Sequence, residues 1–324
     1  MRILSDQGLF QDLDLDVNAV KRYLRAVESE YRFNPYHNRV HALDVMQSCH
    51  AVLMHSPQFL SRLTPIEKLA LLLGAYVHDV GHPGVNNKLL EKLSNDPKNS
   101  IRPDLADFAI MYNSKAILES FHISHAFHIA FSPSHPGGNP FATLTTEQFT
   151  KLRKLMIDLV LVTDMGQHFA FIAKIKSSIY KGGRPERLDL RDDESRLTLM
   201  KGVLHACDVS NPAKPKETSL KWTSVVNQEF YEQGDLETEL YGQPQEALLI
   251  RRDLATPEGK LEVAKGQAAF IKFIVAPLYD QLKTQLPFFM EVCDPCIKAN
   301  TGHWTDVTKA QQELMAAAAS AGKN

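Results

Sequence analysis

Three short segments of the sequence carry histidines at spacings that could hold a metal ion, 37–41, 78–82 and 205–208, and the last two also carry an aspartate. In the first segment His37 and His41 lie four residues apart, so a helix there would place both imidazoles on one face. His78 and His82 repeat this spacing, and Asp79 stands directly beside the first of them. Imidazole and carboxylate groups gathered in this way are typical of metal sites.

The two aspartates Asp79 and Asp208 both follow apolar stretches of sequence. Burial of an ionised carboxylate costs several kcal/mol unless the group is paired or binds a metal. Two imidazoles with two carboxylates suit Zn²⁺ or another borderline transition metal, and one carboxylate can bridge to a harder ion such as Mg²⁺. Since two neighbouring ions can clamp a phosphate for in-line attack, the pattern favours phosphoester hydrolysis and leaves the ester open.

Helices are expected to position these side chains. Apolar residues recur at helical spacing in four stretches of the sequence: 66–80, 152–160, 197–207 and 270–278. Thr64 is a suitable cap for the first helix, and Pro277 is expected to kink or break the last. No alternating segment bounded by hairpin turns predicts a sheet. We therefore predict an all-α fold with a single domain over 1–324, a core at about 36–282 and a fraying tail at 305–324.

Composition excludes several classes of protein. The 324 residues are 44% hydrophobic and 23% charged, which is ordinary for a globular chain. The 36 basic and 38 acidic residues give a net charge of −2, so nothing indicates a nucleic-acid or anionic-membrane partner. The 4 cysteines are too few for a disulfide scaffold, and no apolar run reaches the roughly 18 residues of a membrane span. We expect a reduced, cytoplasmic protein.

Eight motifs follow one another between Tyr36 and Leu282: YHNRVHA at 36–42, HDVGHPG at 78–84, MYN at 111–113, TDM at 163–165, DVSNP at 208–212, WT at 222–223, EFYEQGD at 229–235 and GQAAFI at 266–271. This ordered set resembles the catalytic domain of class I 3′,5′-cyclic nucleotide phosphodiesterases. A histidine–aspartate pair alone is shared with many phosphohydrolases, whereas the whole set is specific. The resemblance implies an all-α fold of the HD-type metal-dependent phosphohydrolase superfamily. It also implies hydrolysis of the 3′-phosphoester of cyclic AMP to the 5′-monophosphate, which terminates cyclic nucleotide signalling, and leaves cyclic GMP open as a second substrate.

The resemblance also implies the metal-site roles. A first metal, usually zinc, would be held by four residues: His41, His78, Asp79 and Asp208. Asp79 would bridge to a second metal, Mg²⁺ or Mn²⁺, whose other ligands are mostly water. His82, Glu119 and Thr163 match positions that hold those waters. His37 matches the general acid that protonates the leaving 3′-oxygen.

The substrate-binding residues follow from the same resemblance. Gln267 matches a glutamine that hydrogen-bonds the purine edge, and its amide can turn to serve adenine or guanine. Phe270 matches the aromatic ring that stacks on the base, and Asn211 adds an amide contact that favours cyclic AMP. The rest of the expected set is Val226 and Phe230, on the other wall of the purine slot, and Tyr36.

The sequence departs from the family at two places near the metals. Many members carry Asp where this chain has Gly81, and Asn-His where it has Ser120-Phe121, which puts the strength of the second metal site in question. The loop 241–260 is longer than in mammalian cyclic-AMP-specific enzymes, and with the insert 94–107 it favours a protozoan, trypanosomatid-like member. Family members usually carry regulatory domains upstream, so such domains are expected here too.

Two other functions compete with this one. A different HD-type phosphohydrolase, acting on nucleoside mono- or triphosphates, predicts clustered basic residues and no Gln267–Phe270 clamp. A catalytically inactive module that senses cyclic nucleotides predicts the loss of a metal ligand or of His37, and the sequence retains them all. The other histidines are expected to be structural, including His125 and His205.

Overall fold

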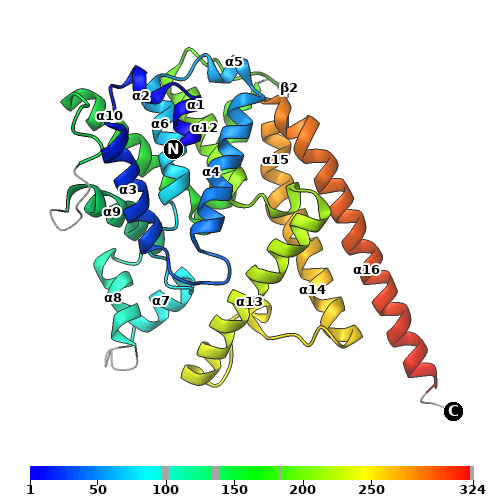
Figure 1. Cartoon of the computed structure of the whole chain (residues 1–324). Coiled ribbons are helices and arrows are strands. Elements are labelled where there is room, and N and C mark those ends of the chain that lie inside the picture. The colour runs from blue at the N-terminus through cyan, green and yellow to red at the C-terminus, as the bar shows by residue number, and fades with distance from the viewer. Residues whose placement is uncertain (97–101, 133–138, 182–183, 322–324) are drawn as a thin grey trace. The chain divides into compact units, whose positions relative to one another are not determined.

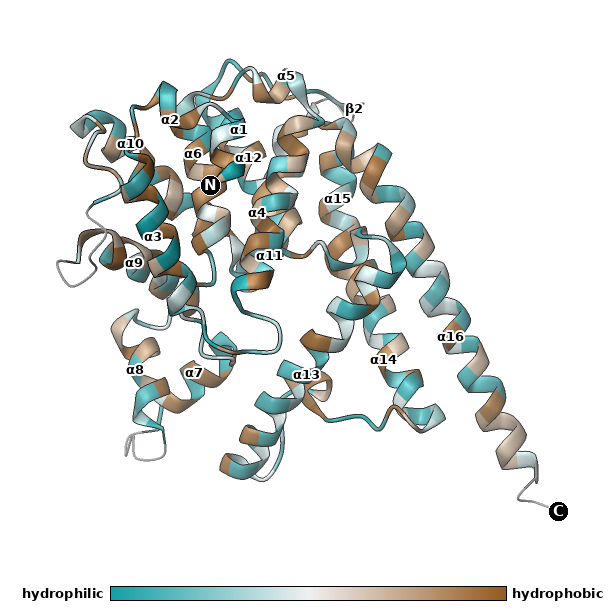
Figure 2. Ribbon diagram, in the orientation of Figure 1, coloured by the Kyte–Doolittle hydropathy of each residue, from teal (hydrophilic) through white to brown (hydrophobic). Residues whose placement is uncertain are grey.

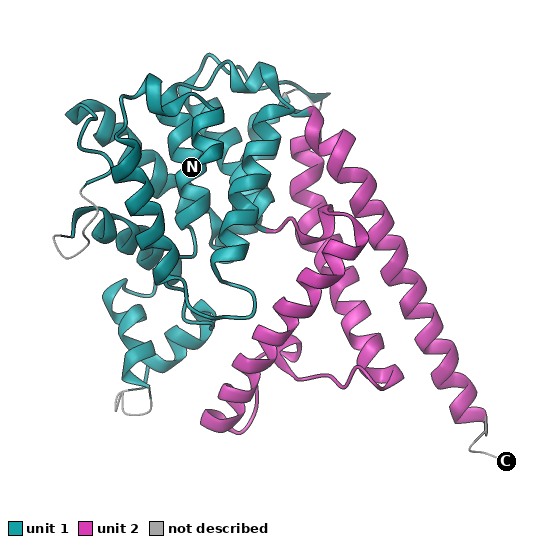
Figure 3. Cartoon of the chain, viewed as in Figure 1, with its two compact units in different colours: residues 1–208, 284–286 teal, residues 209–283, 287–324 magenta. Residues whose placement is uncertain are grey.

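Helices make up nearly all of the regular structure in the part of the chain that the computed structural model describes, residues 1–96, 102–132, 139–181 and 184–321 (Figure 1). The exception there is a short antiparallel strand pair, Tyr180–Lys181 (β1) with Arg184–Pro185 (β2). The predominance of helices confirms the all-α prediction. The described chain divides into two compact units, 1–208 with 284–286 and 209–283 with 287–324, and each is described by itself (Figure 3). One domain over 1–324 stays a prediction.

Unit 1 carries the histidine and aspartate motifs on a bundle of helices. Its elements, besides β1 and β2, are α1 (Arg2–Asp6), α2 (Leu9–Asp12), α3 (Val17–Glu30), α4 (Arg39–Met54), α5 (Pro57–Leu60), α6 (Pro65–Val77), α7 (Asn87–Ser94), α8 (Pro103–Met111), α9 (Ile117–Phe131), α10 (Thr146–Val160), the 3₁₀ turns η1 (Leu161–Thr163) and η2 (Met165–Gln167), α11 (His168–Ile179) and α12 (Asp193–Asp208). Of the insert 94–107, residues 97–101 lie outside the described ranges.

The core of unit 1 forms around α6, which is buried along almost its whole length. Helix α6 packs against α4 and α10, while α12 packs against α4. Thr64 caps α6 as expected: its hydroxyl accepts from the Glu67 backbone N–H, and the Glu67 carboxylate accepts from the Thr64 N–H. Helices such as α3 and α10 instead alternate hydrophobic and hydrophilic residues, since one face is buried and the other exposed (Figure 2).

A buried ion pair joins the first turns of α6 and α12. Arg196 donates from Nε and Nη2 to Glu67 Oε1 over 3.1 and 3.0 Å, and both side chains are at least nine-tenths buried. Arg196 Nη1 also donates to the carbonyls of Leu190 and Arg191, which fixes the chain just before α12. The pair therefore holds together the N-terminal ends of two helices whose C-terminal ends carry Asp79 and Asp208.

Unit 2 carries the remaining motifs. Its elements are the 3₁₀ turn η3 (Asn211–Ala213), α13 (Lys216–Tyr241), the 3₁₀ turn η4 (Ala247–Leu249), α14 (Pro257–Phe270), the π turn η5 (Ile271–Val275), α15 (Ala276–Lys283), the π turn η6 (Phe289–Cys293) and α16 (Asp294–Ala321). Pro277 does not break the chain's helical course: α14 passes into η5 and then α15, with Pro277 in the first turn of α15. A proline inside a helical run lacks the N–H of the regular hydrogen-bond ladder, and the π turn η5 interrupts that ladder directly before α15.

Helix α16 supports the unit and corrects one expectation. Asn300 on α16 donates from Nδ2 to the carbonyls of Pro212 and Lys214, and thereby anchors the turn that begins at Asn211. The tail 305–324, expected to fray, is helical as far as Ala321, and 322–324 lie outside the described residues. Alanine has the highest helix propensity of any residue type, and the run of alanines in this tail explains why it is helical where fraying was expected.

No single described helix is both long and apolar enough to cross a membrane, and one bent pair, Thr146–Thr163 with Met165–Ile179, meets that requirement jointly, by length and composition only.

Candidate metal and active site

The four residues expected to bind the first metal converge in unit 1, with ligand atoms that all lie within 4.8 Å of one another. His41 lies in the first turn of α4, His78 and Asp79 directly follow α6, and Asp208 is the last residue of α12. His41 Nε2 lies 3.1 Å from Asp208 Oδ1 and 3.4 Å from Asp79 Oδ2. His78 Nε2 lies 3.2 and 3.0 Å from the same two oxygens. Two imidazole nitrogens thus face two carboxylate oxygens across one small space.

The donor set fits a divalent cation. His78 Nδ1 lies 2.9 Å from the Ala75 carbonyl and donates to it, so Nε2 is the ring atom that would bind a cation after loss of its proton. Asp79 Oδ2 is buried and has no hydrogen-bond partner among the residues described here. A buried carboxylate oxygen without a hydrogen bond is costly unless a cation compensates its charge.

The electrostatics of the cluster keep both carboxylates ionised. Burial is the largest single influence and raises the pKa of Asp79 and Asp208, but the charges and hydrogen bonds of the surrounding histidines, His78 foremost, together outweigh it, and the pKa of each carboxyl lies well below its usual range. For His78, burial lowers the pKa, yet Asp79 and Asp208 together raise it well above the ordinary value. The ionised carboxylates therefore attract a cation, and a metal bound there would displace the proton of His78.

His37 lies beside the cluster but not on a helix with His41. Helix α4 begins only at Arg39, because the Asn38 side chain caps it by accepting from the Val40 and His41 N–H groups, so the expected shared helix face is wrong. The two rings still lie close, with centroids 5.9 Å apart.

His82 fixes the ring plane of His37. The two imidazoles stack with centroids 4.0 Å apart and an interplanar angle of 12°. Asn34 joins their loops, since its Nδ2 donates to the carbonyls of His37 and His82 over 2.9 and 2.8 Å. The sequence analysis did not single out Asn34, whose side-chain contact with His82 spans 48 positions of the chain.

His122 is a second residue that the sequence analysis missed. It lies on α9 one turn after Glu119, with Nε2 3.8 Å from Asp79 Oδ1, and it forms a second group of potential ligands with Asp79 and His82. Burial lowers the pKa of His122 to about 4, so the ring is neutral. Its position three residues after Glu119 was the available signal, because residues so spaced share a helix face.

Glu119 and Thr163, expected to hold water, are both buried in unit 1. Asn87 donates from Nδ2 to both carboxylate oxygens of Glu119, over 3.0 and 3.3 Å. Burial, reinforced by the charge of Asp164, raises the pKa of Glu119 to about 7. The Thr163 hydroxyl donates to the Val160 carbonyl over 2.8 Å and so turns its lone pairs away from that carbonyl.

Two of the departures from the family, Gly81 and Phe121, are in direct contact with each other. Gly81 has a φ of +77°, and a Cβ at this position would lie 2.9 Å from the Phe121 ring. Phe121 in turn stacks on His125, with centroids 5.2 Å apart, and meets Phe108 edge to face at 4.7 Å. The ring at 121 therefore leaves no room for a Cβ at 81, and neither change replaces a residue of the four-ligand cluster.

The residues expected to bind substrate, apart from Tyr36, lie in unit 2. Gln267 and Phe270 are one turn apart on α14, and Gln267 Oε1 accepts from Thr223 Oγ1 over 3.2 Å. Val226 and Phe230 share a face of α13, whereas Asn211 begins η3 and is buried. Each of the two helices thus carries one of the expected pairs, and the purine slot itself stays a prediction.

Tyr36 lies in unit 1. It is buried, and its ring lies against His41, with centroids 4.5 Å apart. It therefore supports a residue of the cluster as well as preceding His37.

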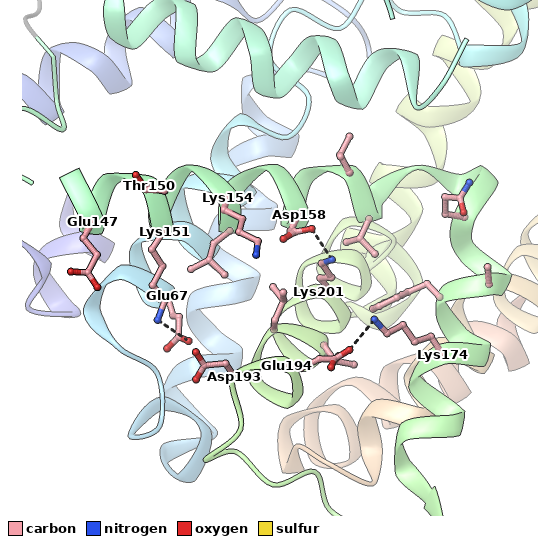
Figure 4. A pocket seen from close by; sticks show the side chains of 18 of the residues that line it. Glu67, Glu147, Thr150, Lys151, Lys154, Asp158, Lys174, Asp193, Glu194 and Lys201 are labelled. Atoms are coloured by element: carbon pink, nitrogen blue, oxygen red, sulfur yellow. Dashed lines mark hydrogen bonds and ion pairs between the residues drawn. The ribbon is translucent and has the colours of Figure 1, made fainter. Parts of the chain in front are cut away.

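A cavity of about 1200 Å³ in unit 1 contains none of these residues. Helices α6, α10, α11 and α12 line it with apolar side chains and three ion pairs: Lys151–Glu67, Lys174–Glu194 and Lys201–Asp158 (Figure 4). Since its lysines are largely neutralised by carboxylates from neighbouring helices, this cavity is no phosphate-binding counterpart to the cluster.

Comparison with known proteins identifies the family. A sequence model of the 3′5′-cyclic nucleotide phosphodiesterases matches residues 36–296. The chain belongs to this family. The family is metal-dependent, its catalytic domain has an all-α HD-type fold, and the cluster of His41, His78, Asp79 and Asp208 is a candidate for its metal site.

Individual phosphodiesterases are similar over most of the chain. A probable 3′,5′-cyclic-AMP phosphodiesterase, pde-4 of Caenorhabditis elegans, is 33% identical over 282 residues, 86% of this chain and 38% of the relative. The 3′,5′-cyclic-AMP phosphodiesterase 4C of Rattus norvegicus is 32% identical over 284 residues, 86% of this chain and 48% of the relative. The chain thus spans less than half the length of these two relatives.

A solved structure shares the fold. It is the phosphodiesterase domain of the RhoPDE fusion protein from the choanoflagellate Salpingoeca rosetta, with a TM-score of 0.83 and 26% identity, and the match covers 96% of this chain and 90% of that one.

Proposed function

We propose that this phosphodiesterase chain hydrolyses the 3′-phosphoester bond of 3′,5′-cyclic nucleotides, and that cyclic AMP is its main substrate. The observation that carries the proposal is the convergence of two imidazoles and two ionised carboxylates within 4.8 Å, in a chain of this family. Relatives named as cyclic-AMP phosphodiesterases, and Asn211 in the chain, support cyclic AMP over cyclic GMP.

The proposed metal ligands are His41, His78, Asp79 and Asp208, with Zn²⁺ in the first site and Mg²⁺ or Mn²⁺ on the far side of Asp79. Mixed nitrogen and oxygen donors support zinc, and a carboxylate with solvent supports the harder ion. Cations bound there supply Lewis acidity toward a phosphoryl oxygen and lower the pKa of water.

The chain's own residues supply the proton and the orientation. As water adds to phosphorus, the bond from phosphorus to the 3′-oxygen breaks, and that oxygen leaves with a proton from His37. His82 keeps the His37 ring in one plane by stacking on it, and Asn34 holds both loops. Glu119 and Thr163 offer buried oxygens that can orient water.

Base recognition is assigned to unit 2. Gln267 keeps its Nε2 available as a donor while Oε1 accepts from Thr223, and Phe270 one turn later offers a ring face for stacking. Asn211, Val226 and Phe230 complete the proposed purine site. Tyr36 directly precedes His37, the proposed general acid, in the sequence.

Cellular context is also a proposal. A cytoplasmic location is supported by the four cysteines, none of which forms a disulfide in the described structure: Cys49, Cys207, Cys293 and Cys296. Regulatory domains upstream are supported by the RhoPDE relative, which is described as a fusion protein. The domain itself is proposed to contact neither nucleic acid nor membrane, in line with its net charge of −2.

The direct test is to incubate the protein with cyclic AMP and cyclic GMP in parallel, with Mg²⁺ and after chelation, and to identify the product. We expect 5′-AMP, no 3′-AMP, and loss of turnover on chelation. Release of phosphate from nucleoside triphosphates instead would favour another HD-type phosphohydrolase. Binding without turnover, in protein shown to hold metal, would favour a sensing module.

A further inference from the structure

The loop between α13 and α14, residues 242–256, folds back along α13 (Figure 1). Successive contacts of this loop fall progressively earlier on the helix: Gln245 binds Glu237, the Leu249 backbone lies against Gly234, and the Arg251 guanidinium lies over the Tyr231 ring. The loop and α13 therefore run antiparallel to each other, and the loop approaches the part of α13 that carries the residues proposed to face the base.

Glu237 fastens the first part of this loop. Its side chain is fully buried, and Oε2 accepts from the Gln245 backbone N–H over 2.5 Å. Oε1 accepts from Gln233 Nε2 over 2.7 Å and from Gln245 Nε2 over 3.4 Å. A buried carboxyl group without these donors would cost free energy, so Glu237 and the loop hold each other in place.

Gly234 admits the next part of the loop, one turn earlier on α13. A Cβ at this position would lie 1.9 Å from the Leu249 carbonyl oxygen, far inside van der Waals contact. The Leu249 side chain is itself buried. The loop thus packs on α13 so closely that position 234 has room for glycine alone.

The residues that hold the loop share a stripe of α13 with the proposed base-binding residues. Thr223, Val226, Phe230, Gly234 and Glu237 recur at intervals of three or four positions and so lie on one face of the helix. The two ends of the stripe are buried, whereas Val226 and Phe230 between them are half-buried. The accessible part of the stripe therefore ends where the loop covers the helix.

We propose that Glu237 is a positioning residue for recognition of the base. By holding the loop 242–256 on α13, it sets the boundary of the accessible surface at Val226 and Phe230 against which the base lies. The inference rests on the proposed function for the assignment of these two residues to the base. Glu237 acts through the loop, so its loss weakens binding of the base and leaves recognition of the phosphate unchanged.

The test compares Glu237→Gln with Glu232→Gln, a control on the same helix whose exposed carboxylate accepts from Gln228. Hydrogen exchange of the loop amides measures the anchoring of the loop. Calorimetric titration of the metal-loaded protein with 5′-AMP, and with ribose 5-phosphate, which lacks the base, measures recognition of the base. In Glu237→Gln we expect at least about tenfold faster loop exchange and at least about tenfold weaker binding of 5′-AMP, with ribose 5-phosphate unchanged. In Glu232→Gln we expect wild-type values.

Gly234→Ala is a second variant, which decides the question where Glu237→Gln fails to fold. Alanine favours the helix, but its Cβ displaces Leu249, so the same two changes are expected. Wild-type loop exchange or wild-type 5′-AMP affinity in the variants, or equal weakening of both ligands, would overturn the inference. Neither readout needs turnover, so a protein that binds 5′-AMP as expected but hydrolyses no cyclic nucleotide would contradict the proposed function alone.

Discussion

Glu67 on α6 and Arg196 on α12 form a buried pair, with Arg196 Nη2 3.0 Å from Glu67 Oε1, at the ends of these helices opposite Asp79 and Asp208. Removal of one partner leaves the other charged and buried. We therefore expect Arg196→Met to lower the free energy of unfolding by about 3–5 kcal/mol in urea titrations. Arg191→Met is the control, because Arg191 and its partner Asp189 are exposed and should contribute little. Equal effects of the two substitutions would show that the buried pair stabilises the fold no more than the exposed pair does.

His37 is the proposed acid, and its removal should separate proton transfer from metal binding. His37→Ala is expected to lower kcat by about 10²–10⁴-fold while metal content per chain stays unchanged, as measured by elemental analysis. The matched control is His125→Ala, because His125 pairs with the surface carboxylate of Glu30. Loss of metal in His37→Ala would make His37 a ligand instead.

Thr223 holds the amide of Gln267, so it should influence the choice between the two bases. With Thr223→Val, Gln267 Oε1 loses the 3.2 Å hydrogen bond and the amide turns more freely. One such bond is worth about 1 kcal/mol, so we expect the ratio of kcat/KM for cyclic AMP and cyclic GMP to change by about fivefold. Gln267→Ala should lower kcat/KM for both nucleotides with metals retained, and unchanged kinetics in both variants would exclude Gln267 from base recognition.

Glu119 should make the stability of the metal-free protein fall with rising pH. Burial raises its pKa from 4.5 to about 7, so between these values the folded state holds a proton that the unfolded state has lost. The free energy of unfolding should therefore decrease by about 3 kcal/mol between pH 4.5 and 7 relative to Glu119→Gln, measured by urea titration at several pH values. Parallel curves for the two proteins would show that Glu119 is ionised in the folded state.

The sequence predicts the four-residue cluster well, because its members stand in short motifs at the ends of apolar helices. The α6 cap at Thr64 and the end of α12 at Asp208 follow from local rules and are confirmed. The helix through His37 is wrong because Asn38 is a cap, a role for which asparagine is a preferred residue and which the histidine spacing concealed.

Contacts between distant parts of the chain could not be predicted in this way. Glu67 and Arg196 are separated by 129 positions, and the fit of Phe121 over Gly81 depends on where α9 lies against the turn after α6. His122 was overlooked because no carboxylate adjoins it in sequence, while Asp79 approaches it in space. The protozoan origin and the individual site roles stay predictions.

The central claim is that cations bound by His41, His78, Asp79 and Asp208 are required for hydrolysis of a cyclic nucleotide. The most direct measurement is to strip the protein of metal, restore Zn²⁺ and then Mg²⁺ stepwise, and follow bound metal and 5′-AMP formation in the same samples, with Asp208→Asn beside the wild type. The account predicts a rate that rises with bound metal in the wild type, and loss of both metal and rate in the variant. Full activity without metal, or normal metal content and rate in Asp208→Asn, would contradict it.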